Sequence, residues 1–160
     1  MRDRRLLRAD RRRYRWNRVA LDAVNVYFTT DNGGVSKCAK TGCAAPTILA
    51  AGPYQGADIA VDATDAYWAT RAGVFRCAAG GCNGSPLMLA PQQAYSLSID
   101  DANVYFTTVD SIMRCAKNGG AAPTVLASGQ TNPGDLAVDA TSVYWTNRND
   151  VGEIRKVRKN

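Results

Sequence analysis

The stretch Leu136–Asn147, LAVDATSVYWTN, decides the fold because the chain contains four versions of it. The other three are Ala20–Thr30 (ALDAVNVYFTT), Ile59–Thr70 (IAVDATDAYWAT) and Ser98–Thr108 (SIDDANVYFTT). Their aspartates are Asp22, Asp62, Asp100 and Asp139, and their tyrosines are Tyr27, Tyr67, Tyr105 and Tyr144. In both sets the successive residues are 40, 38 and 39 positions apart. So regular a period indicates a repeat architecture.

Each repeat contains four short segments with the character of β-strands. In the second repeat they are Ile59–Asp62, the aromatic run Ala66–Thr70, the alternating run Val74–Ala78, and Pro86–Ala90, which begins with proline. Four short strands in about 39 residues are typical of one blade of a β-propeller. We therefore predict an all-β propeller with four-stranded blades at 19–56, 57–94, 95–134 and 135–160, the last ending before its fourth strand.

Ring closure has three possible routes at this stage. A strand at residues 5–10 (RLLRAD) resembles the Thr124–Gly129 segment and would complete the last blade, giving a closed four-bladed ring. Alternatively, two chains pair as a homodimer, or the sequence is part of a larger parent propeller of six to eight blades.

The positive charge of the chain is concentrated at its start. Residues 1–18 hold nine Arg and two Asp, whereas the whole chain has a net charge of +6, so residues 19–160 have a net charge of −1. The simpler interpretation of this arm is a solvated terminus. Attachment to nucleic acid or to an anionic membrane is the alternative. No apolar run approaches the roughly 20 residues that span a bilayer, so we expect no membrane span.

The chain has no histidine, which excludes His-based acid–base catalysis, Ser–His and Cys–His nucleophilic pairs, and His metal sites. No phosphate-binding loop or paired-carboxylate site is evident either. We predict that the protein is not an enzyme and needs no cofactor and no metal.

The five cysteines follow the repeat. Cys38 with Cys43, and Cys77 with Cys82, form two C-x4-C pairs that flank a strand turn. We predict two local disulfides, with free thiols or a zinc site as alternatives. Cys115 is predicted to be a free thiol, because Gly120 stands at its partner position, and a cross-link between two chains is the alternative. Disulfides would place the protein outside the cytoplasm, in the periplasm, at the cell surface or in the medium.

Two motifs carry a family resemblance. Val138-Asp139 followed by Tyr144-Trp145-Thr146 resembles the YWTD-type propellers of lipoprotein receptors. Lys37-Cys38, Gly42-Cys43 and Pro46–Ala50 are similar to the blades of bacterial secreted repeat proteins, YWTD-like or NHL-like. The resemblance covers residues 19–157 and implies a propeller architecture, but no particular activity.

The repeated acidic and aromatic residues are predicted to be structural. We expect the four aspartates to accept hydrogen bonds in turns or between blades, and a metal-binding ring of carboxylates in a central channel is the alternative. The four tyrosines, Trp68 and Trp145 recur at core positions, so we expect them to pack between blades.

The predicted function is that of a non-catalytic binding or scaffold module, with a protein or glycan as ligand and no nucleic acid expected. The ligand would be recognised where the repeats differ, in the loops Asp31–Gly34, Pro53–Ala57, Pro91–Ala94, Thr131–Asp135 and Arg148–Gly152. The alternatives are a propeller-type lyase or hydrolase with a carboxylate-bound metal, and attachment through the basic arm.

Overall fold

In a computed structural model, residues 16–30, 34–52, 56–148 and 151–159 are described here, and their regular structure consists of β-strands. The closing strand predicted at residues 5–10 lies outside these ranges, as do parts of three of the predicted recognition loops. In the described residues there is no helix long and apolar enough to cross a membrane.

The strands form four antiparallel sheets in chain order, which we call blades 1 to 4. Blade 1 comprises β1 (Trp16–Leu21), β2 (Asn25–Thr30), β3 (Val35–Ala39) and β4 (Thr47–Ala50). Blade 2 comprises β5 (Gly56–Val61), β6 (Asp65–Thr70), β7 (Gly73–Ala78) and β8 (Leu87–Ala90). Blade 3 comprises β9 (Leu97–Ile99), β10 (Asn103–Thr107), β11 (Ile112–Ala116) and β12 (Thr124–Ala127), and blade 4 comprises β13 (Pro133–Val138), β14 (Ser142–Asn147) and β15 (Glu153–Arg158). The prediction of four repeated all-β blades is confirmed, and blade 4 has three strands within the described residues.

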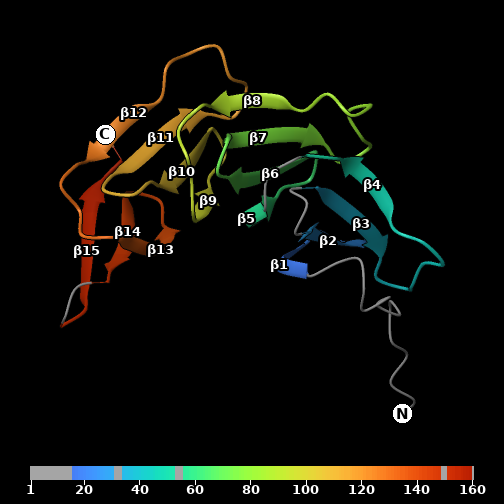
Figure 1. Cartoon of the computed structure of the whole chain (residues 1–160), viewed down its shortest axis with the longest axis horizontal. Coiled ribbons are helices and arrows are strands. Elements are labelled where there is room, and N and C mark those ends of the chain that lie inside the picture. Colours follow the sequence, from blue (N-terminus) through green and yellow to red (C-terminus); the bar gives the residue numbers. More distant parts are fainter. Residues whose placement is uncertain (1–15, 31–33, 53–55, 149–150, 160) are drawn as a thin grey trace.

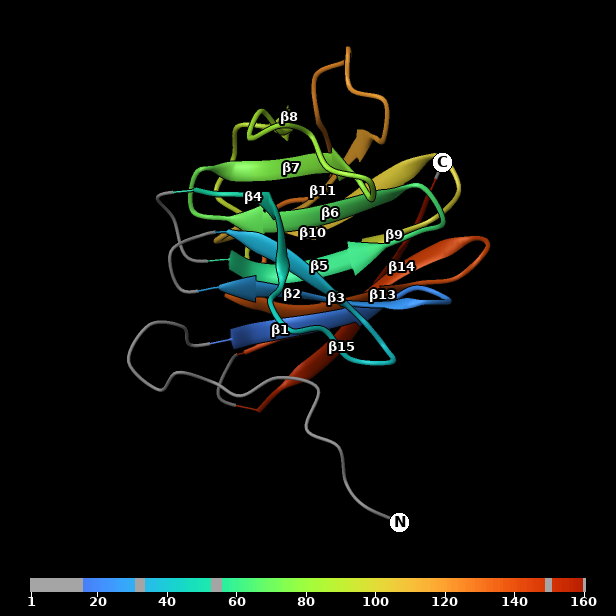
Figure 2. The ribbon, with the colours of Figure 1, turned by 90° about the vertical axis from the view of Figure 1, so that its right-hand side faces the viewer.

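The blades follow one another along an arc (Figure 1). The first strands β1, β5, β9 and β13 lie on the inner side, and β4, β8 and β12 lie on the outer side. Each inner strand contacts the inner strand of the next blade. Seen from the side, the connecting turns gather at the two ends of the strands (Figure 2).

The hydrophobic core is divided into three clusters, one between each pair of consecutive blades. At one of these junctions, Tyr67 and Val74 of blade 2 pack against three residues of blade 3, which are Leu97, Val104 and Phe106. Each of these side chains is at most 5% exposed. Full burial of one such side chain stabilises a fold by roughly 1.5–3 kcal/mol. A single blade has no other partner for this surface, so each blade depends on its neighbours.

One turn has a backbone that only glycine fits well. Gly73 begins β7 with φ of +144°, and a Cβ atom at this position would lie 2.2 Å from the carbonyl oxygen of Ala90. Gly80 lies in a later turn of the same blade, has no positive φ and has open space around its Cβ position.

Gly73→Ala is therefore expected to lower the free energy of unfolding by about 2 kcal/mol or more, because the new methyl group meets backbone atoms and the φ is unfavourable. Gly80→Ala is the matched control and should change it by no more than about 0.5 kcal/mol. Urea unfolding followed by circular dichroism measures both. Equal effects of the two substitutions would contradict this account of the turn.

Candidate functional site

The four repeated aspartates each close a turn within their own blade. Asp100 Oδ1 accepts hydrogen bonds from the backbone N–H of Ala102 (3.0 Å) and Asn103 (2.8 Å), and its Oδ2 accepts one from the Tyr105 hydroxyl (2.8 Å). The same three bonds recur at Asp22, Asp62 and Asp139. The structure thus joins each repeated aspartate to the tyrosine of its own repeat. It does not bring the four carboxylates together.

A lysine from the following blade completes two of these turns. Lys117 Nζ donates to Asp62 Oδ2 at 2.9 Å and lies 5.1 Å from the ring centroid of Tyr67. Lys159 Nζ likewise donates to Asp100 at 2.8 Å and lies 5.0 Å from the ring of Tyr105. At the junction of blades 1 and 2, Ala79 occupies this lysine position.

These contacts change the acidity of both partners. Partial burial raises the pKa of Asp100, but the Lys159 ammonium, the turn amides and the Tyr105 hydroxyl outweigh it and hold that pKa well below its usual range. Burial and the adjacent carboxylate raise the pKa of Tyr105 to about 12. Both shifts favour the ionised carboxylate and the neutral phenol at pH 7.

The lysine contact allows a matched comparison of two aspartates. Asp100→Asn keeps the turn oxygen but loses the ion pair with Lys159, whereas Asp22→Asn in the same kind of turn loses no lysine partner. We expect Asp100→Asn to lower the free energy of unfolding by about 1–2 kcal/mol more than Asp22→Asn at pH 7. Urea unfolding of the two variants beside the unsubstituted protein measures the difference.

The pH dependence of this prediction follows from the lowered pKa of Asp100. The carboxylate stabilises the fold above its unfolded-state pKa of about 3.9, and this contribution is lost as pH falls toward the lower folded-state pKa. The extra effect of Asp100→Asn should therefore shrink below about pH 4. A difference that stays constant down to pH 2 would contradict the ion pair as its cause.

The predicted aromatic residues lie in the core between blades. Trp68 is 2% exposed and stacks on Phe75 with ring centroids 5.9 Å apart. Trp145 is buried, and its Nε1–H donates to Gln130 Oε1 at 3.1 Å. Of the four repeat tyrosines, Tyr144 alone is partly exposed, because no further blade follows blade 4 in the described part of the chain.

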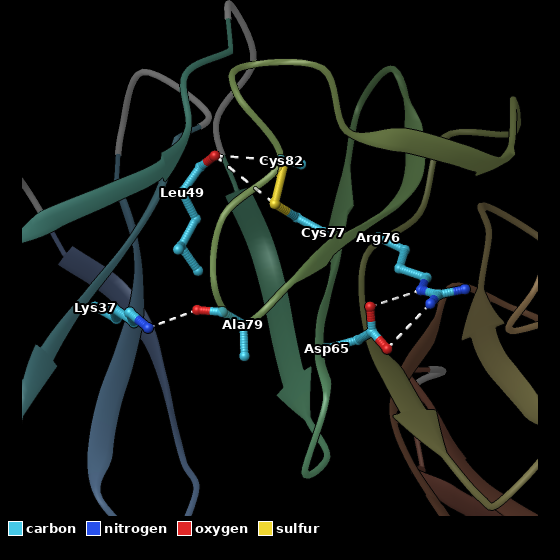
Figure 3. The surroundings of a disulfide bond; sticks show 7 residues. All are labelled: Lys37, Leu49, Asp65, Arg76, Cys77, Ala79 and Cys82. Carbon is cyan, nitrogen blue, oxygen red and sulfur yellow. Dashed lines mark hydrogen bonds and ion pairs between the residues drawn. A yellow bond between two sulfur atoms is a disulfide. The ribbon is translucent and has the colours of Figure 1, made fainter.

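The cysteine pairs are bonded in the structure. The Cα atoms of Cys38 and Cys43 are 5.6 Å apart, and those of Cys77 and Cys82 are 5.4 Å apart. Figure 3 shows the second bridge against the neighbouring blade, where its two sulfur atoms lie 3.7 and 3.4 Å from the carbonyl oxygen of Leu49.

Cys115 is buried and free, and burial raises the pKa of its thiol to about 11, so it is a poor nucleophile at pH 7. The turn after it differs from the other two, because Gly119 and Gly120 both have positive φ. In blade 4 the strand register places Val157 opposite Val143, as Cys115 lies opposite Val104. The residue of blade 4 that is equivalent to Cys115 is therefore Val157.

A second set of residues follows the repeat period, but its residue type changes from one blade to the next. Arg18, Asp58, Ser96 and Asp135 are 40, 38 and 39 positions apart and lie on or beside the inner strands. Bulges in β1, β5 and β13 interrupt the strand register at three of these positions. A bulge turns a side chain away from the regular alternation of the strand, and here it adds polar groups to the inner side of the arc.

These four residues form a polar network across the blades. The Ser96 hydroxyl lies 2.9 Å from Asp58 Oδ2 and 2.8 Å from Asp135 Oδ1. The backbone N–H of Leu97 also donates to Asp58 Oδ2, and Arg18 Nε lies 3.9 Å from Asp58 Oδ1. A hydroxyl has one hydrogen, so Ser96 can donate to only one carboxylate at a time. The other carboxylate oxygen keeps capacity for a donor from a ligand.

The network lines a pocket of about 460 Å³, which we call the axial pocket. All four blades contribute to it, and its lining residues are Arg18, Asp58, Tyr95, Ser96, Asn132, Pro133, Gly134, Asp135 and Arg148. Tyr95 is 42% exposed. No described residue forms an ion pair with the guanidinium of Arg148. In the described residues, no three Cys, Asp or Glu side chains gather as metal ligands would.

Sequence reasoning found part of this pocket. The predicted loops Thr131–Asp135 and Arg148–Gly152 supply five of its residues, whereas Arg18, Asp58, Tyr95 and Ser96 were missed. The strand β1 begins at Trp16, so residues 16–18 belong to blade 1 and not to the predicted arm. The sequence signal for Arg18, Asp58 and Ser96 is that they are spaced by the repeat period. Because the residue type changes between them, they do not form a recognisable motif.

Comparisons with known proteins identify the architecture. No protein-family model matches the chain, and no curated protein sequence matches it. Among solved structures, the computationally designed Ika4 protein matches with a TM-score of 0.79 and 11% identity, over 98% of this chain and 99% of the designed one.

Two natural structures are also similar. A catalytically inactive virginiamycin B lyase from Staphylococcus aureus, crystallised with quinupristin, matches with a TM-score of 0.70 and 12% identity over 94% of this chain. A structure of a nidogen/laminin complex matches with a TM-score of 0.66 and 18% identity over 82% of it. The chain spans 57% and 56% of these two proteins. At such identities the likeness establishes a β-propeller-like fold and nothing further.

Proposed function

We propose that this protein is a non-catalytic binding module that holds a small polar ligand with a carboxylate, such as an acidic saccharide, in the axial pocket. The observation that carries the proposal is the variation at one repeat position. The turn aspartate and the core tyrosine are the same in every blade, whereas the position of Arg18, Asp58, Ser96 and Asp135 holds three different residue types around one pocket. Packing alone does not require such variation.

The chemistry of the lining suits this class of ligand. The guanidinium of Arg148 can pair with a carboxylate in a bidentate manner. The exposed ring of Tyr95 offers an apolar face to a sugar ring, and the carboxylates of Asp58 and Asp135 accept hydrogen bonds from hydroxyl groups. A pocket of about 460 Å³ is within the range of ordinary small-molecule sites.

The module is proposed to work outside the cytoplasm. Its two disulfides are typical of proteins from oxidising compartments. The sequence resemblance to YWTD-like and NHL-like secreted repeat proteins supports the same location. The similar nidogen/laminin structure is, by its name, that of a complex, which agrees with binding as a use of such blades.

Arg148 provides the test, with Arg71 as its matched control. Arg71 occupies the equivalent position of blade 2, one residue after β6, but does not line the pocket. Isothermal titration with glucuronic acid should show binding that Arg148→Ala weakens at least about tenfold, through loss of one charge-assisted contact. Arg71→Ala should bind as the unsubstituted protein does. Glucose, which lacks the carboxylate, should bind more weakly than glucuronic acid.

Other outcomes would favour other functions. Equal loss of glucuronic acid binding in both arginine variants would place the site elsewhere on the protein. The similar lyase motivates a parallel assay: metal-dependent turnover of quinupristin, abolished by Asp58→Asn, would establish an enzyme in place of a binding module. Deleting residues 1–15 should leave saccharide binding unchanged, and loss of binding would instead support a role for the basic arm.

A further inference from the structure

The three junctions between blades repeat one set of contacts. In each, the preceding blade supplies a buried tyrosine and a buried β-branched residue, and the following blade supplies an apolar residue from its first strand. The β-branched residues are Val35, Val74 and Ile112, all 0% exposed. The first-strand residues are Ile59, Leu97 and Leu136, which are 6%, 5% and 7% exposed. A residue at an equivalent position should be buried wherever a neighbouring blade is present.

In blades 2 to 4 the first strand packs against the preceding blade, but the corresponding surface of blade 1 has no partner in the described part of the chain. Val19 occupies the position of Ile59, 40 residues earlier, but is 60% exposed. Leu21, two residues on and on the same face of β1, is 58% exposed. These two side chains lack the contacts that bury Ile59 and Leu136 in other blades.

In blades 1 to 3 the other face packs against the following blade, but the corresponding surface of blade 4 has no partner among the described residues. Ile154 pairs with Thr146 as Ile112 pairs with Thr107, so the two isoleucines are equivalent. Ile112 is 0% exposed and Ile154 is 81% exposed. Two apolar strand faces therefore lie open at opposite ends of the arc (Figure 1).

The polar residues of the two open faces are also complementary. Lys40, Lys117 and Lys159 occupy the same position of their repeats. In each case the backbone N–H of the lysine donates to a backbone carbonyl in the turn between the first two strands of its own blade, which is that of Val24, Ala102 or Thr141. Lys117 and Lys159 each bond an aspartate of the preceding blade, whereas Lys40 on blade 1 is exposed. Asp139 on blade 4 has the same turn and tyrosine but no lysine within the described residues.

A third element of the junction is a cation that donates to a backbone carbonyl. Arg76 of blade 2 donates to the carbonyl of Lys117 at 3.1 Å, and Arg114 of blade 3 donates to that of Lys159 at 2.5 Å. Lys156 pairs with Tyr144 as Arg114 pairs with Tyr105, so Lys156 is the equivalent cation of blade 4. If blade 1 of another copy followed blade 4, Lys156 would reach the backbone carbonyl of Lys40 in that copy.

We propose that two copies of this chain associate head to tail, with blade 4 of each copy packed on blade 1 of the other. Lys40 of one copy then donates to Asp139 of its partner copy, and Val19 packs beside Ile154. The end faces of one chain are separated by the opening of the arc, so a second copy is the occupant that presents both complementary surfaces (Figure 1). Two such junctions are equivalent by a two-fold axis and give a closed ring of eight blades.

Association also explains how open strand faces can persist in a folded chain. Exposed apolar strand surfaces favour uncontrolled aggregation, and a closed assembly covers both of them at once. The axial pocket opens on the inner side of the arc, so the ring would enclose one pocket from each copy. The proposal does not rest on the acidic ligand, because the junction residues and the pocket residues are different sets.

Sedimentation equilibrium of the full chain tests the proposal. We expect twice the 17.2 kDa of one chain. Ile154→Asp should shift the mass to that of one chain, with an unchanged circular dichroism spectrum, because this side chain is 81% exposed in the single copy. Ile48→Asp is the matched control: Ile48 and its equivalents Met88 and Val125 are exposed in blades 1, 2 and 3, so the mass should stay doubled.

A mixing experiment distinguishes head-to-tail pairing from pairing of two identical surfaces. Val19→Asp and Ile154→Asp each damage a different face, so each variant alone should be monomeric. Mixed in equal amounts, they retain one intact junction and should form a heterodimer. A monomeric unsubstituted protein, a dimer that survives Ile154→Asp, an assembly larger than two copies, or no heterodimer on mixing would overturn the proposal.

Discussion

The packing of one blade on the next is the interaction on which the whole structure depends. A four-stranded sheet of about 20 strand residues cannot cover its own apolar faces, so its buried tyrosine needs the adjacent blade. At two of the three junctions the Tyr–Asp pair is completed by Lys117 or Lys159 from that blade. The same contact thus joins apolar burial to a charge-assisted hydrogen bond and fixes how neighbouring blades are aligned. At the remaining junction Lys37 bonds the carbonyl of Ala79, at 2.5 Å (Figure 3).

Most of the fold follows from the sequence because the junction residues repeat. The roles of Tyr67 and Asp62 are predictable because a tyrosine and an aspartate recur at these positions in all four repeats. The strand β5 shows where this reasoning fails. It begins at Gly56, three residues before the predicted Ile59, because a bulge between Gly56 and Asp58 breaks the alternation of apolar and polar residues. Alternation is the signal by which a strand is recognised in a sequence, so a bulge hides its own position.

The candidate site was predictable only in outline for the same reason. Asp135 falls in a loop that the differences between repeats had already marked, but its contact with Ser96 depends on two blades being packed together. The position of Ser96 holds an arginine in the first repeat and an aspartate in the second, so no sequence motif connects these residues. The spacing of 40, 38 and 39 residues becomes informative once the inner strands are known to converge. Residues that agree between repeats specify the fold, and residues that disagree at a shared position indicate the site.

The two ends of the arc follow from applying this principle to single residues. Val19 and Ile154 agree in chemical character with their buried equivalents, although neither is buried in the single chain. The equivalents of Val19 and Ile154 are buried wherever a neighbouring blade is present, whereas the exposed Ile48 matches Met88 and Val125, which are exposed as well. Lys40 and Asp139 likewise keep the residue types of a formed junction. Residues that agree with the repeat specify contacts, so four agreeing residues on open faces indicate a contact that one copy cannot make. The aligned residues of the pocket carry no such requirement, so the proposed assembly and the proposed ligand site depend on different residues within the same period.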